Sequence, residues 1–330
     1  MRRVKIALLL ILPLAWILYW VGAAQFSERY AGPRLDGALI EGAAISHGGL
    51  SMAGFPHRFE LSVARPRLLD ARRGMGWSAP SMRLEAASYR PQDVTLRLPD
   101  TQQLHLPGET LAVTSTRLDA GMRVRPLARL GLDALRLDAT GLRIESPQGW
   151  RAGLGAATLR MDRADRTGRR HDLTIDATDL VPPTGLAGGA IPARIDGARL
   201  DAQLEFTRPI DRDAADALPP LAALAALELR ESMVGWGRVE IRAQGTLDFD
   251  AAGRPEGRLT LRLTHWRDLL DLVEAADLLG GTELALAERA LQSLEDRGDV
   301  ADQVEVPLTL SDGMIRLGAL PLAPIPRLSP

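Results

Sequence analysis

The sequence contains no cysteine and no asparagine, and Lys5 is its only lysine. Without cysteine the chain can form neither disulfides nor thiolate metal sites, so the fold must rest on its core. Without asparagine it has no acceptor for N-glycosylation. Lysine and asparagine both use A/T-rich codons. We therefore attribute their scarcity to a GC-rich bacterial genome and do not interpret the abundant arginine as an anion-binding signal.

Aromatic residues are also scarce, at 4% of the chain, which argues against stacking platforms for sugars or bases. The 40 basic and 42 acidic residues nearly balance, and 37 basic residues remain when the three before the N-terminal apolar segment are set aside. This mildly acidic remainder has no electrostatic footprint for nucleic acid. We expect no nucleic-acid partner, and no cofactor is indicated.

The first 24 residues predict a membrane segment. Arg2, Arg3 and Lys5 precede nineteen residues, 6–24, that carry no charged side chain. At about 1.5 Å per helical residue this segment spans roughly 28 Å, close to the ~30 Å hydrocarbon core. The basic flank favours a cytoplasmic N-terminus. We therefore expect a cytoplasmic flank (1–5), one transmembrane signal anchor (6–24) in the bacterial inner membrane, and the bulk of the chain in the periplasm.

A cleaved signal peptide is the alternative for this segment. Gly22-Ala23-Ala24 is a small-x-small cleavage site, but a signal core usually has about 7–15 apolar residues and this run is longer. Trp16, Tyr19 and Trp20 near its far end favour a retained anchor, since such residues lie at the membrane interface. Export is common to both interpretations.

Apolar and polar residues alternate repeatedly from Ile45 to Phe206, as is typical of strands with one apolar and one wet face. Glycine, proline and aspartate separate the pieces at spacings often near 8–12 residues, which favours an antiparallel meander over alternating βαβ units. The clearest pieces are 59–63, 94–98, 111–114, 135–138, 142–145, 159–162 and 173–176.

The pattern changes near residue 208. Residues 211–218 are helix-like, 221–229 are rich in alanine and leucine, and helical periodicity returns at 266–279 and 283–294. Between and after them we expect a strand at 239–242, hairpins over 247–263 and 304–317, and an extended Pro-rich end at 320–330. The predicted fold is α+β and β-dominated: a long curved antiparallel sheet (25–207) that continues with helices and hairpins (208–330), on one N-terminal transmembrane helix.

So many amphipathic strands cannot stay one flat open sheet, because sheet twist makes wide sheets curl or split. The apolar face must be covered by self-closure, by the two or three helices, or by a ligand such as lipid. If a groove accommodates lipid, its walls come from the inward residues of the strands. One residue of slip would reverse the face. The lipid-facing candidates are Leu96, Leu98, Leu111, Val113, Leu135 and Leu137.

Catalytic and metal-binding motifs are weak. Residues 49–53 resemble the Gly-x-Ser-x-Gly elbow of serine hydrolases but end in alanine, with no helix after them. The five histidines are dispersed; His47 and His57 flank one predicted turn and could meet across a hairpin, but two histidines do not make a zinc site. We assign no catalytic residue and no metal site.

Two glycine-containing segments suggest ligand loops but fit them poorly. Residues 248–253 resemble part of a calcium loop, yet Ala252 replaces a ligand, and a hairpin turn explains the segment better. Residues 153–158 lack the third glycine of the dinucleotide fingerprint and do not follow a strand-to-helix switch.

Three segments together resemble a known family. They are Gly54-Phe55-Pro56-His57-Arg58-Phe59, Trp77-Ser78-Ala79-Pro80, and Asp312-Gly313-Met314-Ile315-Arg316-Leu317-Gly318 with its Pro-rich tail. With the anchor, they are similar to the alphaproteobacterial domain-of-unknown-function family 2125 (DUF2125). That family has no assigned catalytic residues, and a distant AsmA-like character would imply a curved sheet with a lipid-binding groove.

The same segments have a structural interpretation. Gly54, Phe55 and Pro56 form a predicted turn, because glycine permits unusual backbone angles and proline fixes its own. Phe59 and the tryptophans at 77, 150, 236 and 266 are expected to be core anchors.

Three functions follow from this sequence in order of preference. The first is a non-enzymatic envelope protein that binds lipid on a concave apolar sheet face. The second is an envelope scaffold or assembly protein whose sheet packs on itself. The third is a periplasmic hydrolase, which would need a histidine and an acid beside a serine or threonine in a cleft. The inner membrane is the expected partner, lipid a further one, and protein partners are not identified.

Overall fold

The computed structural model describes residues 39–40, 43–54, 56–70, 74–126, 129–183, 193–211, 224–250, 253–275, 280–298, 300–318 and 320–325. These residues are dominated by antiparallel strands and contain two α-helices. The chain divides into two compact units, Met1–Met122 (the N-terminal unit) and Arg123–Pro330 (the C-terminal unit).

The described strands of the N-terminal unit form two sets. Neighbours in the first set are β3 (Gly49–Ala53), β4 (Arg58–Ala64), β7 (Ser81–Ala87) and β8 (Arg90–Arg97). Neighbours in the second are β1 (Leu39–Ile40), β2 (Ala43–Ser46), β5 (Arg67–Asp70), β6 (Met75–Ser78), β9 (Thr101–Leu106) and β10 (Glu109–Thr114). Strand β11 (Arg117–Arg125) crosses the division between the units.

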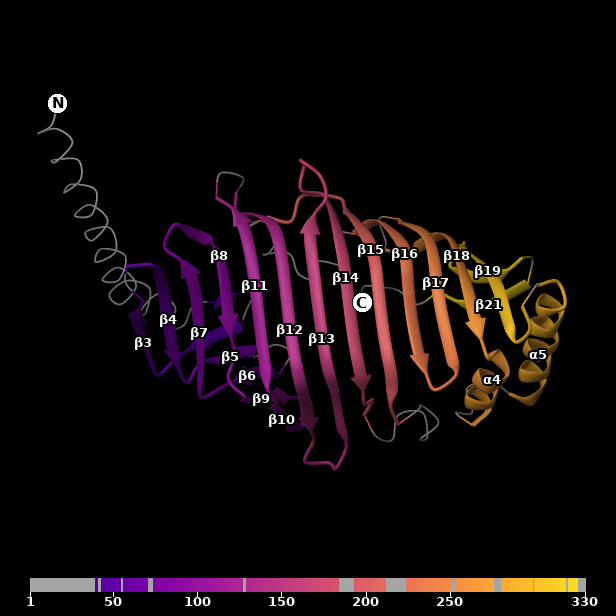
Figure 1. Ribbon diagram of the computed structural model, residues 1–330, viewed down its shortest axis with the longest axis horizontal. Helices are drawn as coiled ribbons and strands as arrows, with labels where there is room; N and C mark the ends of the chain where they lie inside the picture. Colours follow the sequence, from indigo (N-terminus) through magenta and orange to yellow (C-terminus); the bar gives the residue numbers. More distant parts are fainter. Residues whose placement is uncertain are drawn as a thin grey trace, which may run out of the picture. The chain divides into compact units, whose positions relative to one another are not determined.

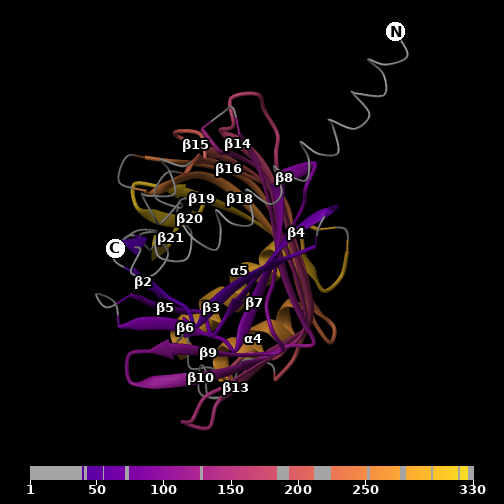
Figure 2. The same ribbon diagram turned by 90° about the vertical axis from the view of Figure 1, so that its left-hand side faces the viewer.

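Prolines mark three of the corners at which the chain passes from one set to the other. Pro66 lies between β4 and β5, Pro80 between β6 and β7, and Pro99 between β8 and β9. Proline has no N–H to give to a ladder, so pairing cannot continue unchanged through these positions. Instead the Arg65 N–H donates to the Pro80 carbonyl at 2.9 Å and the Ala79 N–H to the Pro66 carbonyl at 3.2 Å. The strands of the predicted meander are therefore bent here, and β5, β6, β9 and β10 lie together (Figure 2).

The predicted turn at 54–56 lies between β3 and β4. Gly54 has φ +96°, and its carbonyl accepts the Arg58 N–H at 3.0 Å. Phe55 lies outside the described residues. The serine-elbow segment 49–53 is strand β3, which leaves its serine on a sheet and not on a strained turn.

The two histidines near this turn do not meet across a hairpin. His47 precedes β3 and His57 follows it, so the whole strand separates them. The expectation that a hairpin could bring them together is wrong because the turn connects 53 to 58 and not 47 to 57. In the described part of the chain, no group of three or more acidic or histidine side chains could hold a metal ion.

The described part of the C-terminal unit is an antiparallel meander in which each strand from β12 pairs with the next (Figure 1). This confirms the β-dominated antiparallel prediction. The strands are β12 (Gly131–Glu145), β13 (Arg151–Arg163), β14 (Arg170–Leu180), β15 (Ile195–Phe206), β16 (Leu224–Trp236), β17 (Val239–Phe249), β18 (Pro255–Thr264), β19 (Gln303–Ser311), β20 (Met314–Leu317) and β21 (Leu320–Pro324).

Two predicted strands, 135–138 and 142–145, belong to the single strand β12. Gly141 between them has φ +59°, yet pairing with β13 continues on both sides of it. The glycine interrupts the pleat, but the hydrogen-bonded ladder continues past it. In the sequence, the break in alternation at this glycine looks the same as a turn between two strands.

The region around residue 208 does not end the sheet. Strand β15 pairs directly with β16, so the C-terminal unit continues across the point where the sequence pattern changes. The Ala- and Leu-rich residues 224–229 are part of β16 because their leucines pair with β15 and β17. The helix-like segment 211–218 lies almost entirely outside the described residues.

Two of the three helical segments predicted after residue 208 are confirmed, as α4 (Trp266–Ala275) and α5 (Gly281–Glu295). Asp268 lies in the first turn of α4, where a carboxylate is favourable to the helix dipole. The helices pack on a core of Leu263, Trp266, Val304 and Val306, in which Trp266 is fully buried.

No helix of the described residues is long and apolar enough to cross a membrane. The predicted transmembrane segment, 6–24, lies outside those residues.

Candidate functional site

Twelve uncharged apolar side chains form a regular patch on one side of β12–β15, which we call the apolar face. The strand registers align them in three rows of four, one from each strand. Because alternate residues of a strand point to the same side, each row and its neighbours share one face. The rows are Leu135, Met161, Leu173 and Ala202; Leu137, Leu159, Ile175 and Leu200; and Ala139, Ala157, Ala177 and Ala198.

The intervening residues of the same strands form a charged face. Arg199 pairs with Asp176 at 3.3 Å, and Arg230 of β16 reaches Asp172 at 2.7 Å and Asp201 at 3.5 Å. The hydrogen bond with Asp172 raises the pKa of Arg230. These cross-strand pairs match opposite charges on a solvated surface. The four strands therefore have one wet side and one that water solvates poorly.

The apolar face is only partly covered over β12–β15. Leu137 is 36% exposed, most of the other leucines are half-buried, and the fully buried members are small, with Ala202 at 0%. Further along the same face, helices cover the apolar residues. The row that contains Leu200 continues across β16 and β17 to Leu261 and Val306, and α4 and α5 pack on the sheet there.

A hollow of about 500 Å³ lies at one end of the apolar face, where β12, β13 and the end of β14 meet. We call it the glycine hollow, because Gly141, Gly153 and Gly155 help to line it. A Cβ at Gly153 would lie 2.7 Å from the Leu142 carbonyl oxygen, and one at Gly155 would lie 2.8 Å from Asp179 Cβ. These close approaches require glycine, and the missing side chains leave the space open.

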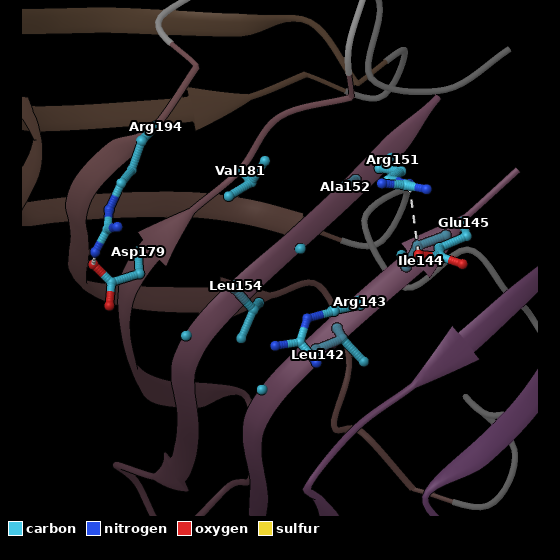
Figure 3. Close-up of a pocket in the computed structure, with 13 residues that line it drawn as sticks. Leu142, Arg143, Ile144, Glu145, Arg151, Ala152, Leu154, Asp179, Val181 and Arg194 are labelled. Carbon is cyan, nitrogen blue, oxygen red and sulfur yellow. Dashed lines mark hydrogen bonds and ion pairs between the residues drawn. The ribbon is translucent and has the colours of Figure 1, made fainter. Parts of the chain in front are cut away.

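The rim of the hollow combines apolar and charged groups. Arg194 forms an ion pair with Asp179 on one side, and Arg151 lies 3.6 Å from Glu145 on the other (Figure 3). Arg143 also lines the hollow and forms no ion pair with another described residue. The apolar lining comes from Leu142, Ile144, Leu154 and Val181, the last being 40% exposed.

At the opposite end, the apolar face is bordered by an ion pair and a buried histidine. In the row beyond Leu135, the Arg163 guanidinium lies 2.9 Å from Asp133, and next to it His171 is fully buried. The His171 ring meets Phe206 edge-on, with 5.8 Å between ring centres. Burial lowers the pKa of His171, because the charged imidazolium would lose its hydration.

The turn after β13 is held by Asp165. Its carboxylate accepts backbone N–H groups of Gly168 at 2.7 Å and Arg169 at 3.1 Å, and a hydrogen bond from Thr167. Burial raises the pKa of Asp165, but these hydrogen bonds outweigh it and lower the value to about 2. Asp165 is thus an ionised turn residue, and its role is structural.

One serine and one histidine do come together in the N-terminal unit. Ser78 Oγ lies 3.0 Å from His105 Nε2, and His105 Nδ1 lies 3.1 Å from Thr110 Oγ1. In a serine hydrolase the third residue is a carboxylate that stabilises the imidazolium, and a threonine hydroxyl cannot do so. We therefore do not assign hydrolase chemistry to this group.

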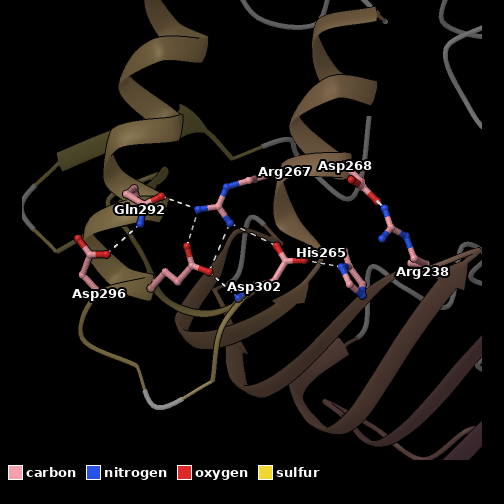
Figure 4. A network of polar contacts seen from close by, with 8 residues as sticks. Arg238, His265, Arg267, Asp268, Gln292, Asp296 and Asp302 are labelled. Carbon is pink, nitrogen blue, oxygen red and sulfur yellow. Dashed lines mark hydrogen bonds and ion pairs between the residues drawn. The ribbon is translucent and has the colours of Figure 1, made fainter.

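The most extensive polar network joins the two helices to the sheet (Figure 4). Arg267 contacts Glu295 at 2.7 Å and Asp302 at 3.3 Å, and it stacks over Trp266 at 4.2 Å. His265 also pairs with Asp302. Hydrogen bonds from Arg267 and the Asp302 N–H lower the pKa of Glu295. Every member contacts another member, so the network serves to hold α4 and α5 in place.

The six lipid-facing candidates are divided between the units. Leu135 and Leu137 lie on the apolar face, next to Met161 and Leu159. The other four lie in the N-terminal unit. Leu96 of β8 pairs with Leu84 of β7, and Leu98 follows β8. In β10, Leu111 is buried at 3% exposure and Val113 lies beside Gln102 of β9. Only Leu135 and Leu137 among the six candidates therefore lie on the apolar face.

No sequence motif predicts the glycine hollow. Residues 153–158 do not fit the dinucleotide fingerprint, but the position of Gly153 and Gly155 inside a strand is a usable signal. A glycine in a strand interior often marks a place where another group approaches the backbone closely. The partners that complete the hollow, Arg194 above all, come from other strands.

Comparison with families of related sequences matches residues 20–326 to a family described as uncharacterised proteins conserved in bacteria, DUF2125. Comparisons with curated proteins and with solved structures find no match. The matched segment covers nearly the whole chain, which confirms the resemblance inferred from its motifs. The chain belongs to the DUF2125 family of bacterial proteins.

Proposed function

We propose that this protein is a membrane-anchored envelope protein that binds lipid on the apolar face of its C-terminal unit. The supporting observation is the contrast along one side of the sheet. Over β17–β19 the chain's own helices cover the apolar residues, whereas over β12–β15 twelve apolar residues form a face with Leu137 36% exposed. A surface of this kind in an exported protein is favourable for an acyl chain.

The energetics suit reversible binding. Each CH₂ group removed from water contributes about 0.8 kcal/mol, so a short acyl segment offsets the cost of association. From Leu135 to Arg143 strand β12 extends eight residues, or about 27 Å at 3.4 Å per residue. Half of a ~30 Å bilayer core is about 15 Å, so one acyl chain fits within this length.

Photo-crosslinking in the full-length chain tests this function. A photoreactive benzophenone amino acid is placed at Leu159 on the apolar face, in cells grown with radiolabelled phosphate, and lipid adducts are measured after illumination. The matched control carries the probe at Arg160, the next residue of β13, which lies on the charged face opposite Arg136. Adducts at 159 but not at 160 are expected. Equal labelling at the two positions would contradict lipid binding by this face.

The proposed location is the inner membrane, with residues 6–24 as anchor and the bulk of the chain in the periplasm. Protease added to spheroplasts should then degrade the chain, while intact cells protect it. Protection of the chain in spheroplasts would overturn this topology.

A scaffold role is the second candidate, and the core over β17–β19 favours it. There Leu263, Val304 and Val306 are at most 8% exposed, so this end of the sheet packs on the chain itself. If position 159 yields protein adducts and no lipid adducts, the face binds a protein partner.

A further inference from the structure

The glycine hollow differs from a second hollow of the C-terminal unit in what surrounds it. That second hollow, on the charged face, is lined by Arg230, Arg242, Arg262 and four further polar side chains, and each of these arginines pairs with a carboxylate. The glycine hollow combines four large apolar side chains and Ala152 with three arginines, of which Arg143 forms no ion pair with a described residue. It therefore offers both an apolar wall and positive charge.

The net charge at the rim is positive. Arg143, Arg151 and Arg194 are opposed by two carboxylates, Glu145 and Asp179. The Arg151–Glu145 pair is wide at 3.6 Å and both side chains are more than half exposed, so solvent screens it and a stronger anion can displace it. Guanidinium groups bind phosphate through paired charge-assisted hydrogen bonds, which makes them suited to a phosphate ligand.

The hollow also adjoins the apolar face directly. The row Ala139, Ala157, Ala177 and Ala198 precedes it, and the next positions of β13 and β14 in the same alternation are Gly155 and Asp179. Gly141 and Asp179 both have positive φ, +59° and +56°, so the pleat is interrupted and residues of both alternations line the hollow. A molecule with a charged end and an apolar tail matches this arrangement, in which a charged hollow adjoins an apolar face.

We propose that the glycine hollow binds the anionic headgroup of a phospholipid whose acyl chain lies on the apolar face. The proposal rests on the proposed lipid-binding function and adds a selectivity for anionic over zwitterionic lipids. Arg143 contacts the lipid phosphate, and Arg151 and Arg194 contribute the surrounding positive charge. The small side chains of the alanine row leave room for the glycerol region between the headgroup and the leucine rows.

The test compares two lipids on the full-length chain. Purified protein carrying the photoreactive residue at Leu159 is incubated in mild detergent with phosphatidylglycerol or with phosphatidylcholine, and the adduct yields are measured by mass spectrometry. We expect several-fold more adduct with phosphatidylglycerol. Arg143→Glu should lower that yield about tenfold, since a hydrogen bond to a charged group is lost and a repulsion is added. It should lower the phosphatidylcholine yield less, because that lipid has the same phosphate but no net negative charge.

Arg160→Glu is the matched control, because it makes the same charge change on the charged face of the paired strand β13. Arg143→Gln with Arg151→Gln removes positive charge without adding a negative one and should weaken the preference in the same direction. Unfolding midpoints of all variants should equal that of the parent, since these side chains are exposed.

The outcomes separate the two proposals. Equal yields for the two lipids in the parent, or equal losses in Arg143→Glu and Arg160→Glu, would overturn headgroup recognition and leave lipid binding standing. Absence of adducts with either lipid would overturn the proposed function, and the headgroup site with it.

Discussion

The two ends of the C-terminal sheet differ in how far the apolar side of the sheet is covered. At β17–β19 the apolar side of the sheet is buried by α4 and α5, with Trp266 at 0% exposure and Val304 at 2%. At β12–β15 the equivalent rows keep Leu137 at 36% exposure. The strand pattern is the same in both places. Among the described residues the connections differ: α4 and α5 follow β18, whereas short turns join β12 to β13 and β13 to β14. Burial is therefore a property of the connections, and the uncovered rows are the ones available to a ligand.

Replacing Trp266 by alanine should have the largest effect on stability. Its side chain is fully buried between the helices and the sheet, and truncation of a buried aromatic costs about 3–5 kcal/mol. Urea denaturation of the full-length chain measures the loss. Leu159→Ala on the apolar face is the comparison and should cost less than half as much, because this side chain is only half-buried. Equal losses would show that the apolar face is as tightly packed as the helix-covered end.

Leu137→Asp should separate lipid binding from folding. The side chain is 36% exposed, so the new carboxylate keeps contact with water and the free energy of unfolding should fall by only about 1 kcal/mol. Lipid adducts at position 159 should disappear, because a charge would lie in the path of the acyl chain. Val306→Asp, in the helix-covered core, should instead unfold the protein. If Leu137→Asp also unfolds it, the region is core and the contrast between the two ends fails.

His171 predicts a pH dependence at the end of the apolar face that it borders. Burial lowers its pKa in the folded state, while the unfolded chain titrates near 6.5. The unfolded state therefore binds more protons as the pH falls through 6.5, so stability is complete above that pH and decreases below it, by at most about 1.4 kcal/mol per pH unit. The charged groups around the ring are Asp165, Arg163 and Arg125.

The measurement is urea denaturation between pH 7.5 and 5.5. His171→Leu keeps an apolar side chain against Phe206 and should flatten the dependence in this range. An unchanged slope in that variant would assign the dependence to other groups.

Glu295→Gln should give the smallest effect. The variant keeps the shape of the side chain but removes the charge that faces Arg267 at 2.7 Å. Because hydrogen bonds from Arg267 and the Asp302 N–H lower the pKa of Glu295, its contribution is present above pH 4.5 and decreases as the pH falls below that value. The unfolding midpoint at pH 7 should fall slightly, and the difference from the parent should shrink as the pH falls below 4.5. A loss as large as that of Trp266→Ala would mean that the network, and not the core, holds the helices.

Several parts of this fold were predictable because they depend on neighbours in the sequence. The alternation in 173–176 predicted β14, the periodicity of 266–279 predicted α4, and Asp312-Gly313 predicted the turn between β19 and β20. Local propensity and side-chain direction are set within a few residues, so a single pass along the chain recovers them.

The predicted lipid-facing residues lie in different parts of the fold. Leu135 and Leu137 were identified from alternation alone and lie on the apolar face, but Leu96 and Leu111 belong to the N-terminal unit. Alternation shows that a residue is on the apolar side of its strand, yet it does not show which other strand lies beside it. That depends on register and on pairing between distant segments.

The sequence by itself determined the strands, the two helices, the family and the absence of thiol chemistry, since these follow from composition, local periodicity and recognisable motifs. Only the tertiary structure decided that three rows of apolar residues align on β12–β15, that helices cover the far end of the same face, and that Gly153 and Gly155 lie beside Arg194 and Asp179. The physical reason is that each of these arrangements is a contact between residues far apart in the chain, and the free energy of such contacts is set by packing and register across strands and not by local preference.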